Sequence, residues 1–276
     1  MNIWINGQPA DQVKLPNRGL AYGDGLFETI RVHKRTWLNA SWHKRRLVHG
    51  ASRLQILNPE NRTLFNELWH QAFEHFAAEG PDQGVVKITL VRRFDGRGYG
   101  FSQPSHFDFI VEWYDQVSDW GWQRLPARID ISPIPVSVNP VLAGIKHLNR
   151  LDSVLASQDA QSKGLDEALL LHDHQVVEGA MTNVFMIKNR VLVTPPLRHG
   201  GVNGVMRERV LQWGHELFEQ VSIRNLTTAD LKQADGIFLT NAIVAIWPVA
   251  SLGAQTFSQL SLIDPLTEIA RQEFQA

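Results

Sequence analysis

The chain has 276 residues, of which 43% are hydrophobic and 20% are charged, and its formal net charge is −1 at pH 7. This composition is typical of a soluble globular protein with one large domain or two ordinary ones. The near-neutral charge gives no electrostatic basis for binding nucleic acid or an anionic membrane surface. Because there is no cysteine, disulfides, thiolate nucleophiles and cysteine-ligated metals are excluded.

Targeting and membrane segments are not expected. The N-terminal "MNIWINGQPADQV" lacks a basic region followed by a long apolar run, so we expect no signal peptide. No apolar run reaches the roughly 18 residues that a membrane-spanning helix needs. These features fit a cytoplasmic protein.

The first part of the chain predicts antiparallel strands joined by tight turns. Residues 2–9 read as strand, Asn-Gly turn and strand, and "GLFETIRVHKRTWLN" repeats that pattern with a turn at Lys34 and Arg35. The stretches "GVVKITLVRRF" and "HFDFIVEWY" read as two more strands on either side of the glycine-rich loop "DGRGYGFSQP".

Two helices are expected between these strands. Ser41 is a plausible N-cap for a helix that places Leu47, Ala51 and Leu54 on one face. The stretch "RTLFNELWHQAFEHFAAEG" predicts a second amphipathic helix that is closed by Gly80.

The texture of the sequence changes around residues 115–125. A helix after Lys146 carries Leu148, Leu151, Val154 and Leu155 at helical spacing, so we expect it to pack on that face. Short strands follow with turns at 172–174 and 188–190, then a glycine loop that enters a helix, and then strand, short helix and strand. The pattern predicts a mixed α/β (α+β) fold with a smaller domain over 1–115 and a larger one over 116–276 that carries the lysine.

Lys146 and Glu178 are candidate functional residues, and each also has an ordinary structural explanation. Lys146 lies where a Pro- and Val-rich extended stretch gives way to a helix. It is either a surface lysine or a partly buried lysine with a depressed pKa, the kind that forms Schiff bases. Glu178 lies beside Gly179 between two strands and is either a turn residue or a carboxylate that holds a buried cation.

An anion site is suggested further along the chain. In "GVNGVMR" glycines precede a helix, so the N–H groups of Val205 and Met206 can face an anion. Arg46 in "HKRRL" is either a solvated arginine or an anion ligand. No dinucleotide-binding or P-loop glycine motif occurs, and "HDH" at 172–174 reads as a solvated turn rather than a metal site. A lysine, a carboxylate and an anion site together fit pyridoxal phosphate.

The sequence resembles the fold-type IV pyridoxal phosphate enzymes, which include branched-chain and D-amino acid aminotransferases and aminodeoxychorismate lyases. The resemblance rests on the order and spacing of "RGLAYGDGLFETIRV", "HKRRL", "GRGYG", "AGIKHLNRL", "VVEGAMTNVF", "GVNGVMR" and "TNAIVAIWPV". It implies that Lys146 is the Schiff-base lysine, Glu178 the partner of the pyridine nitrogen, Arg46 a phosphate ligand, and Val205 and Met206 donors of backbone N–H groups to the phosphate. It also implies a homodimer.

Within this group the chain is most similar to the lyases, because of "KHLNRL" and "GRGY". Asn241 and Ala242 stand where many aminotransferases have a phosphate-binding threonine, and the lyases also read Asn-Ala there. The implied reaction converts 4-amino-4-deoxychorismate to 4-aminobenzoate and pyruvate in folate biosynthesis, with Lys146 as base and acid. Arg97, assisted by Tyr99, is the candidate for binding the substrate carboxylates.

Two alternatives to this reading remain. The first is an aminotransferase acting on D- or branched-chain amino acids, which would require a 2-oxo acid as acceptor. The second is a binding or assembly protein that kept the fold and lost the chemistry.

Overall fold

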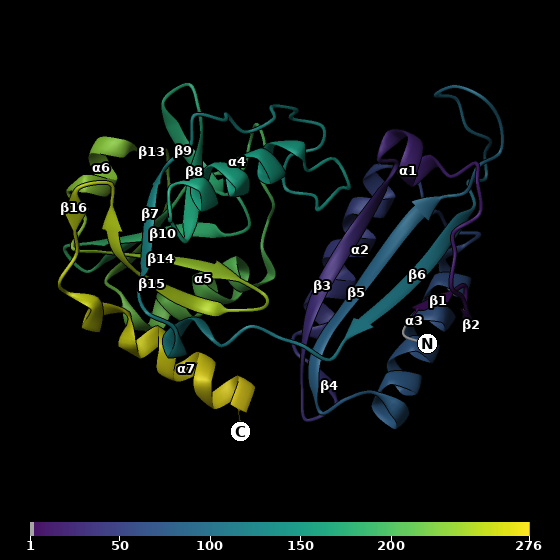
Figure 1. Ribbon diagram of the computed structural model, residues 1–276, viewed down its shortest axis with the longest axis horizontal. Coiled ribbons are helices and arrows are strands. Elements are labelled where there is room, and N and C mark those ends of the chain that lie inside the picture. The colour runs from purple at the N-terminus through teal and green to yellow at the C-terminus, as the bar shows by residue number, and fades with distance from the viewer. Residues whose placement is uncertain (1–2, 276) are drawn as a thin grey trace. The chain divides into compact units, whose positions relative to one another are not determined.

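A computed structural model describes residues 3–275 of the chain, which divide into two compact units (Figure 1). The first unit comprises residues 3–117 together with Ile145–Asn149, and the second comprises Ser118–Gly144 together with residues 150–275. Each unit combines a β-sheet with helices, which confirms the mixed α/β fold class. Among residues 3–275, no helix has the length and apolar character needed to cross a bilayer.

The first unit is built on an antiparallel sheet of six strands in the order β2-β1-β6-β5-β3-β4. The strands are β1 (Ile3–Ile5), β2 (Gln8–Pro9), β3 (Gly25–His33), β4 (Thr36–Trp37), β5 (Gln83–Arg92) and β6 (Phe107–Tyr114), and the helices are α1 (Arg18–Tyr22), α2 (Ala40–Arg53) and α3 (Arg62–Glu79).

The hairpin turns of this unit lie where the sequence predicts them. Asn6 and Gly7 join β1 to β2, and Lys34 and Arg35 join β3 to β4, all four with positive φ. Two successive residues in the left-handed region give the turn type whose twist matches that of the strands. Gly80 closes α3 as expected.

The start of α2 corrects one detail. The cap residue is Asn39 in the left-handed conformation, the helix begins at Ala40, and Ser41 lies inside its first turn. Leu47 and Ala51 are fully buried on the inner face of α2 as predicted, whereas Leu54 is only partly buried.

The second unit contains a larger mixed sheet. Its order is β12-β11-β10-β14-β15-β7-β8-β9-β13, with β16 paired to β15. The strands are β7 (Ala127–Ile131), β8 (Glu167–His172), β9 (Gln175–Gly179), β10 (Asn183–Lys188), β11 (Val191–Thr194), β12 (Gln220–Ile223), β13 (Leu226–Thr227), β14 (Gly236–Asn241), β15 (Ala245–Leu252) and β16 (Gln255–Thr256). The helices are α4 (Leu151–Ser162), α5 (Val205–Leu217), α6 (Thr228–Lys232) and α7 (Asp264–Gln275), with 3₁₀ turns η1 (Gly121–Gln123) and η2 (Leu260–Ile263).

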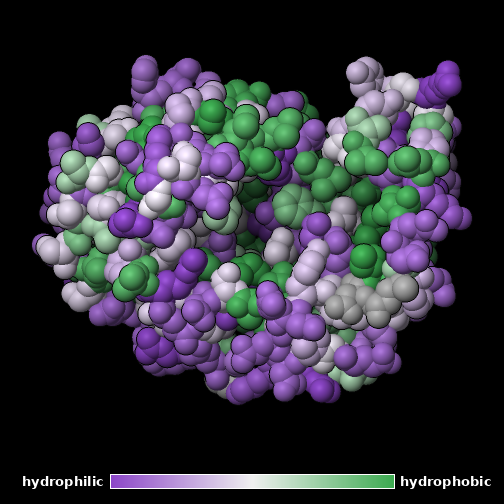
Figure 2. Space-filling model, viewed as in Figure 1, coloured by the Kyte–Doolittle hydropathy of each residue, from purple (hydrophilic) through white to green (hydrophobic). Residues whose placement is uncertain are grey.

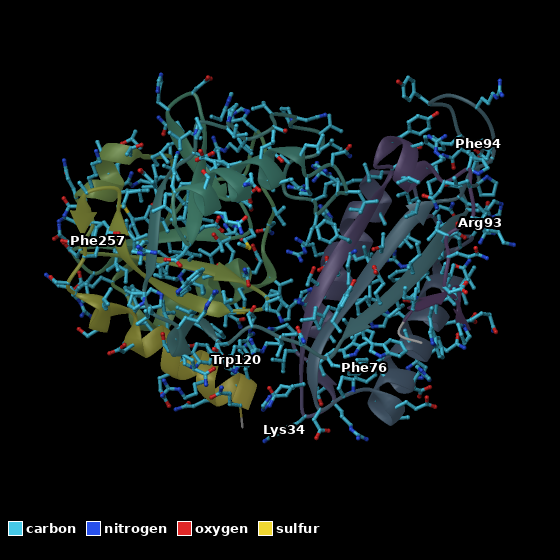
Figure 3. The ribbon with its side chains drawn as sticks, viewed as in Figure 1. Lys34, Phe76, Arg93, Phe94, Trp120 and Phe257 are labelled. Atoms are coloured by element: carbon cyan, nitrogen blue, oxygen red, sulfur yellow. The ribbon has the colours of Figure 1, made fainter. Side chains whose placement is uncertain are left out.

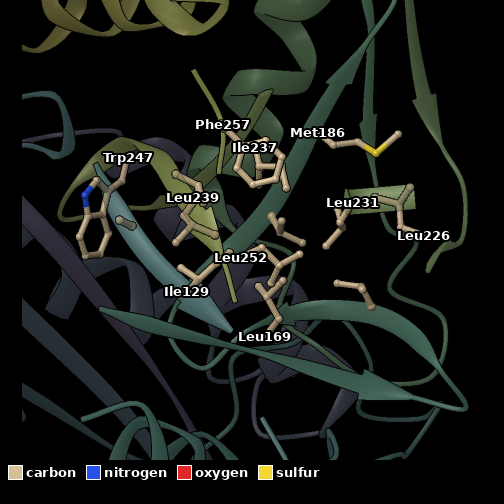
Figure 4. Packing of buried hydrophobic residues seen from close by; sticks show 14 of the residues in the cluster. Ile129, Leu169, Met186, Leu226, Leu231, Ile237, Leu239, Trp247, Leu252 and Phe257 are labelled. Carbon is tan, nitrogen blue, oxygen red and sulfur yellow. The ribbon is translucent and has the colours of Figure 1, made fainter. Parts of the chain in front are cut away.

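An apolar cluster on this sheet forms the main core of the second unit (Figure 4). Ile237 and Leu239 of β14 face Trp247 and Val249 of β15 within it, and all four are at most 4% exposed. The opposite face of β14 carries Phe238, whose ring stacks on that of Phe185 of β10 at 5.1 Å. Because both faces of these strands are covered, they read as continuous apolar runs rather than alternating ones.

The packing face predicted for the helix after Lys146 is wrong. In α4, Leu151, Val154 and Leu155 are 77%, 59% and 54% exposed, and Ala156 and Ala160 are the buried residues. Small alanines let α4 approach β8 closely, so the leucines and valine lie on the outer face. Figure 2 shows apolar side chains gathered at the surface over α4.

Candidate active site

Lys146 lies in a short extended segment that pairs with the edge of β3. The N–H of Phe27 donates to the carbonyl of Lys146 and the N–H of Leu148 donates to that of Gly25, both at 3.0 Å. This pairing groups Lys146 with the first unit, whereas the sequence placed it in the second domain. The Nζ atom of Lys146 lies 4.2 Å from the centre of the Phe27 ring, a distance at which the ring face attracts a cation.

Beside this segment, β3 and α2 form a buried ionic cluster that the sequence analysis missed. Glu28 is fully buried, and its carboxylate accepts two hydrogen bonds from Arg46, Nε to Oε1 at 2.9 Å and Nη2 to Oε2 at 2.5 Å. Nδ1 of His43 lies 2.6 Å from the same Oε2. Two signals were available: an acid at an inward position of an apolar strand, and a His and an Arg three residues apart on one helix face.

The cluster fixes the charges of its members. Burial by itself would raise the pKa of Glu28, but the charge and hydrogen bonds of Arg46, together with His43, lower it from 4.5 to about 2. Burial lowers the pKa of His43, and the Glu28 carboxylate only partly opposes this. The positive charges of Arg46 and Lys146 lower the pKa of His43 further. The imidazole is therefore neutral at pH 7 and donates from Nδ1 to the ionised carboxylate.

Glu178 lies at the end of β9 in the second unit and is 6% exposed. The N–H of Val202 donates to its Oε2 at 2.8 Å. Gly201 has φ +81°, and a Cβ there would lie 3.3 Å from Cδ of Glu178, so glycine suits both the turn and the close approach. Burial lowers the pKa of Arg207, while the charges of Glu208 and Glu178 act against that shift. Glu178 therefore accepts a backbone N–H bond and interacts electrostatically with Arg207.

A second buried acid, Glu167, shapes the turn that follows Glu178. Its carboxylate accepts hydrogen bonds from the N–H groups of Ala168, Ala180 and Met181 and from the hydroxyl of Thr182, at 2.9–3.1 Å. Burial raises the pKa of Glu167, and these four donors oppose the rise. The residue holds the chain between β9 and β10, and only its position as the first residue of the apolar strand β8 could have indicated it.

The predicted glycine loop and helix are present at the start of α5. Gly204 is the cap residue, no side chain caps the helix, and α5 begins with the buried Val205 and Met206. A Cβ on Gly204 would lie 2.0 Å from Oδ1 of Asn183, which donates through Nδ2 to the carbonyl of Val202 at 2.9 Å. Asn183 pairs in register with Thr240, whose buried hydroxyl has no partner among residues 3–275.

Asn241 organises the turn between β14 and β15. Its Oδ1 accepts the N–H groups of Ile243 and Val244, both at 2.9 Å, and its Nδ2 donates to the carbonyl of Met181 at 3.3 Å. Ala242 lies within the turn. The side chain of Asn241 thus joins this turn to the one that Glu167 holds.

Arg97 and Tyr99 lie on the connection between β5 and β6 in the first unit. Both are exposed, Tyr99 to 84%. The structure therefore groups the candidates in three places. Lys146 lies beside the cluster that contains Arg46, whereas Arg97 and Tyr99 lie on their own loop. In the second unit the other candidates lie where strands and a helix meet their connecting turns, and hydrogen bonds join these turns to one another. They are Glu178 at the end of β9, Val205 and Met206 at the start of α5, Asn241 at the end of β14 and Ala242 in the turn that follows.

These surroundings fit pyridoxal phosphate. The cofactor requires a lysine, a partner for the pyridine nitrogen and an anion site. Glu178 is a buried carboxylate, as the pyridine nitrogen requires. The start of α5, which no side chain caps, and the unpartnered hydroxyl of Thr240 are groups that suit a phosphate.

Comparisons with known proteins agree with this geometry. The family described as amino-transferase class IV matches residues 25–252. The chain is 30% identical to an aminodeoxychorismate lyase of Vibrio harveyi, over 91% of this chain and 92% of that one. It is 29% identical to a putative branched-chain-amino-acid aminotransferase of Methanocaldococcus jannaschii, over 99% and 95%.

Among solved structures, 4-amino-4-deoxychorismate lyase from Pseudomonas aeruginosa superimposes with a TM-score of 0.90 at 33% identity, covering 98% of each chain. The family match extends over most of the chain, and these relatives align over nearly its whole length, so the resemblance seen in the sequence is confirmed. The chain belongs to the class IV aminotransferase family of pyridoxal-phosphate-dependent enzymes.

Proposed function

We propose that the chain is a lyase that converts 4-amino-4-deoxychorismate to 4-aminobenzoate and pyruvate. The observation that carries the proposal is the end-to-end similarity to two lyases of that name, one by sequence and one by structure. The turn between β14 and β15 also supports the proposal. There the side chain of Asn241 accepts two backbone N–H groups, at the position where many aminotransferases have a phosphate-binding threonine.

In this proposal five residues of the chain would hold the cofactor. Lys146 would bind its aldehyde, Glu178 would bind its pyridine nitrogen, and Arg46 with the N–H groups of Val205 and Met206 would bind its phosphate. When bound, pyridoxal phosphate supplies an electron sink for the charge left by proton removal. Glu178 would face the ring nitrogen with a buried carboxylate whose Oε2 accepts the N–H of Val202.

Lys146 moves the proton in this proposal. Its Nζ takes a proton from the ring carbon that bears the amine. The bond between the neighbouring ring carbon and the enolpyruvyl oxygen then breaks, the six-membered ring becomes aromatic, and Nζ returns the proton to the methylene carbon of the departing three-carbon unit to give pyruvate. The Phe27 ring covers one side of Nζ and limits the access of water to it. Arg97 on the β5–β6 loop binds a substrate carboxylate, with Tyr99 beside it.

The deciding experiment measures products from 4-amino-4-deoxychorismate without any 2-oxo acid. Equal amounts of 4-aminobenzoate and pyruvate over many turnovers would support the lyase. A Lys146→Ala variant should lose turnover and the absorbance change that borohydride produces, whereas the surface variant Lys163→Ala should lose neither. If no product forms and the protein instead transfers amine from D-alanine or leucine to 2-oxoglutarate, the aminotransferase alternative replaces the lyase.

We also propose that the chain forms a homodimer in the cytoplasm. The outer face of α4 supports the dimer, because three large apolar side chains lie on it together, exposed by more than half. Exposed apolar patches on soluble proteins often mark interfaces. Light scattering of the purified protein measures the mass and decides between one copy and two.

A further inference from the structure

The connection between β5 and β6 extends beyond the sheet of the first unit and has little packing of its own. It leaves β5 near Arg93 and Phe94, which Figure 3 labels, and curves past α1 (Figures 1 and 3). A Cβ added to Gly96, Gly98 or Gly100 would meet no other atom within 4 Å. Within the loop the N–H of Ser102 donates to Oδ2 of Asp95 at 2.6 Å, which joins its two arms. The glycine-rich tip between them loses much entropy on ordering, so a further group is needed to hold its shape.

The holding group is Arg18, the first residue of α1. Its side chain is 3% exposed, and its guanidinium donates to three consecutive carbonyls of the loop. Nη1 donates to Gly98 and Gly100, and Nη2 donates to Tyr99, all at 3.1 Å. The ring of Tyr22 lies 5.2 Å below the guanidinium and 5.3 Å from the ring of Tyr99. The buried guanidinium of Arg18 therefore binds the middle of the loop, residues 98–100.

Arg18 is itself fixed by a shared carboxylate. Its Nε donates to Oδ2 of Asp24 at 2.8 Å, and Nε of Arg92 donates to the same oxygen at 2.9 Å. Nη1 of Arg92 donates to the hydroxyl oxygen of Ser105 at 2.9 Å, and Cζ of Arg92 lies 3.6 Å from the centre of the Phe101 ring. The Asp24 carboxylate thus connects Arg18, which binds the middle of the loop, to Arg92, which contacts Phe101 and Ser105 where the loop returns toward β6.

We propose that Arg18 is a positioning residue that, with Asp24 and Arg92, fixes the loop over residues 94–104 so that Arg97 is presented to a substrate carboxylate. The inference rests on the proposed function, since it takes Arg97 as the carboxylate ligand. The carbonyls of residues 98–100 turn inward to Arg18, and the side chains of Arg97 and Tyr99 remain outside in solvent. Three carbonyls in a row require a planar fork of donors, which lysine does not have.

The structural part of the inference is tested by Arg18→Lys, which keeps the charge and loses the fork. Amide hydrogen exchange over 94–104 should become about tenfold faster, because two or more charge-assisted hydrogen bonds are lost. Trypsin cleavage after Arg97 should rise by a similar factor. Arg35→Lys is the matched control, since it alters an Arg–Asp pair at an exposed turn. Unchanged exchange and cleavage in Arg18→Lys would overturn the proposal.

The functional part is tested by a double-mutant cycle between Arg18→Lys and Arg97→Ala in the holoenzyme. We expect Arg18→Lys to raise KM for the substrate about fivefold or more, with kcat and the cofactor absorbance unchanged. In an Arg97→Ala background the same change should have no further effect on KM, because Arg18 acts through Arg97. A merely structural role would lower the thermal midpoint and leave KM alone, and additive effects on KM would likewise overturn the positioning role.

Failure of the inference can be told apart from failure of the proposed function. If the wild-type protein makes no 4-aminobenzoate, the lyase proposal fails, and the same cycle is then run with the amino acid or 2-oxo acid that the protein does use. If the lyase is active and Arg97→Ala leaves KM unchanged, Arg97 does not bind substrate and the positioning role of Arg18 is overturned.

Discussion

Replacing Glu28 with glutamine should destabilise the protein strongly at neutral pH and only weakly in acid. The carboxylate is fully buried and holds Arg46 through two hydrogen bonds and His43 through one. Glutamine has nearly the same shape, so the change removes the charge and leaves little cavity. The neutral amide cannot accept in the same way from both partners, and the Arg46 guanidinium, with its side chain 12% exposed, keeps a charge without its counter-ion.

The magnitude follows from the pKa of Glu28. Its fall from 4.5 to about 2 means that the ionised form stabilises the folded chain by ~3 kcal/mol at pH 7. Because the folded pKa is depressed, this contribution is complete above the unfolded pKa of 4.5 and is lost as the pH falls toward about 2. At pH 3 roughly 1 kcal/mol should remain.

The assay is urea unfolding of wild type and Glu28→Gln at a series of pH values between 3 and 7. The difference in unfolding free energy should shrink from about 3 kcal/mol to about 1 kcal/mol across that range. Glu74→Gln, which alters an exposed acid on α3 paired with His70, should show almost no difference at any pH. A Glu28→Gln protein as stable as wild type at pH 7, or a difference that does not change with pH, would refute the reasoning.

Three further outcomes are expected. Glu178→Gln should lower kcat at least tenfold, because an amide does not stabilise a protonated pyridine nitrogen, and unchanged steady-state turnover would remove Glu178 from that role. Glu167→Gln should cost about 1–3 kcal/mol in urea unfolding, because the amide nitrogen would face donors that now converge on the carboxylate, and a loss below about 0.5 kcal/mol would contradict this. Changing Leu151 and Leu155 to glutamate should halve the mass measured by light scattering; a wild-type protein that is already a monomer would contradict the dimer.

The effect of the lowered His43 pKa on stability should also be visible in the pH series. Because burial lowers its pKa in the folded chain, the unfolded state binds a proton more readily below pH 6.5, and stability falls as the pH drops from that value. Changing His43 to glutamine should flatten the stability profile between about pH 6.5 and 5, as measured in the same urea titration. An unaltered profile would show that the ring is not held neutral.

Local features of the chain could be predicted from sequence because they depend on few residues. The hairpin turn at Asn6–Gly7, the closure of α3 at Gly80 and the glycine loop before α5 follow from backbone preferences within a short stretch. The turn at Lys34–Arg35 was predicted from the strand patterns on either side of it, since neither residue favours the positive φ that it adopts. The identity of the family followed from the order of many short motifs, which no single one of them could establish.

The packing of α4 was mispredicted for a physical reason. Periodic apolar residues predict a buried face, but the sequence does not specify whether that face packs against the same chain or against another molecule. In α4 the buried face is formed by Ala156 and Ala160, while Leu151 and its apolar neighbours face outward. Helical periodicity therefore identified an apolar face correctly and assigned it to the wrong surroundings.

The sequence by itself determined the fold class and the family, and it identified Lys146 and Glu178 as candidate functional residues. These results follow from residue types and their spacing along the chain. Only the tertiary structure decided which groups surround them. Glu28 lies 18 residues from Arg46, and Arg18 lies 80 or more from the carbonyls that it binds. Such contacts depend on how strands and helices from distant segments come together, and burial then sets the charges of the side chains involved.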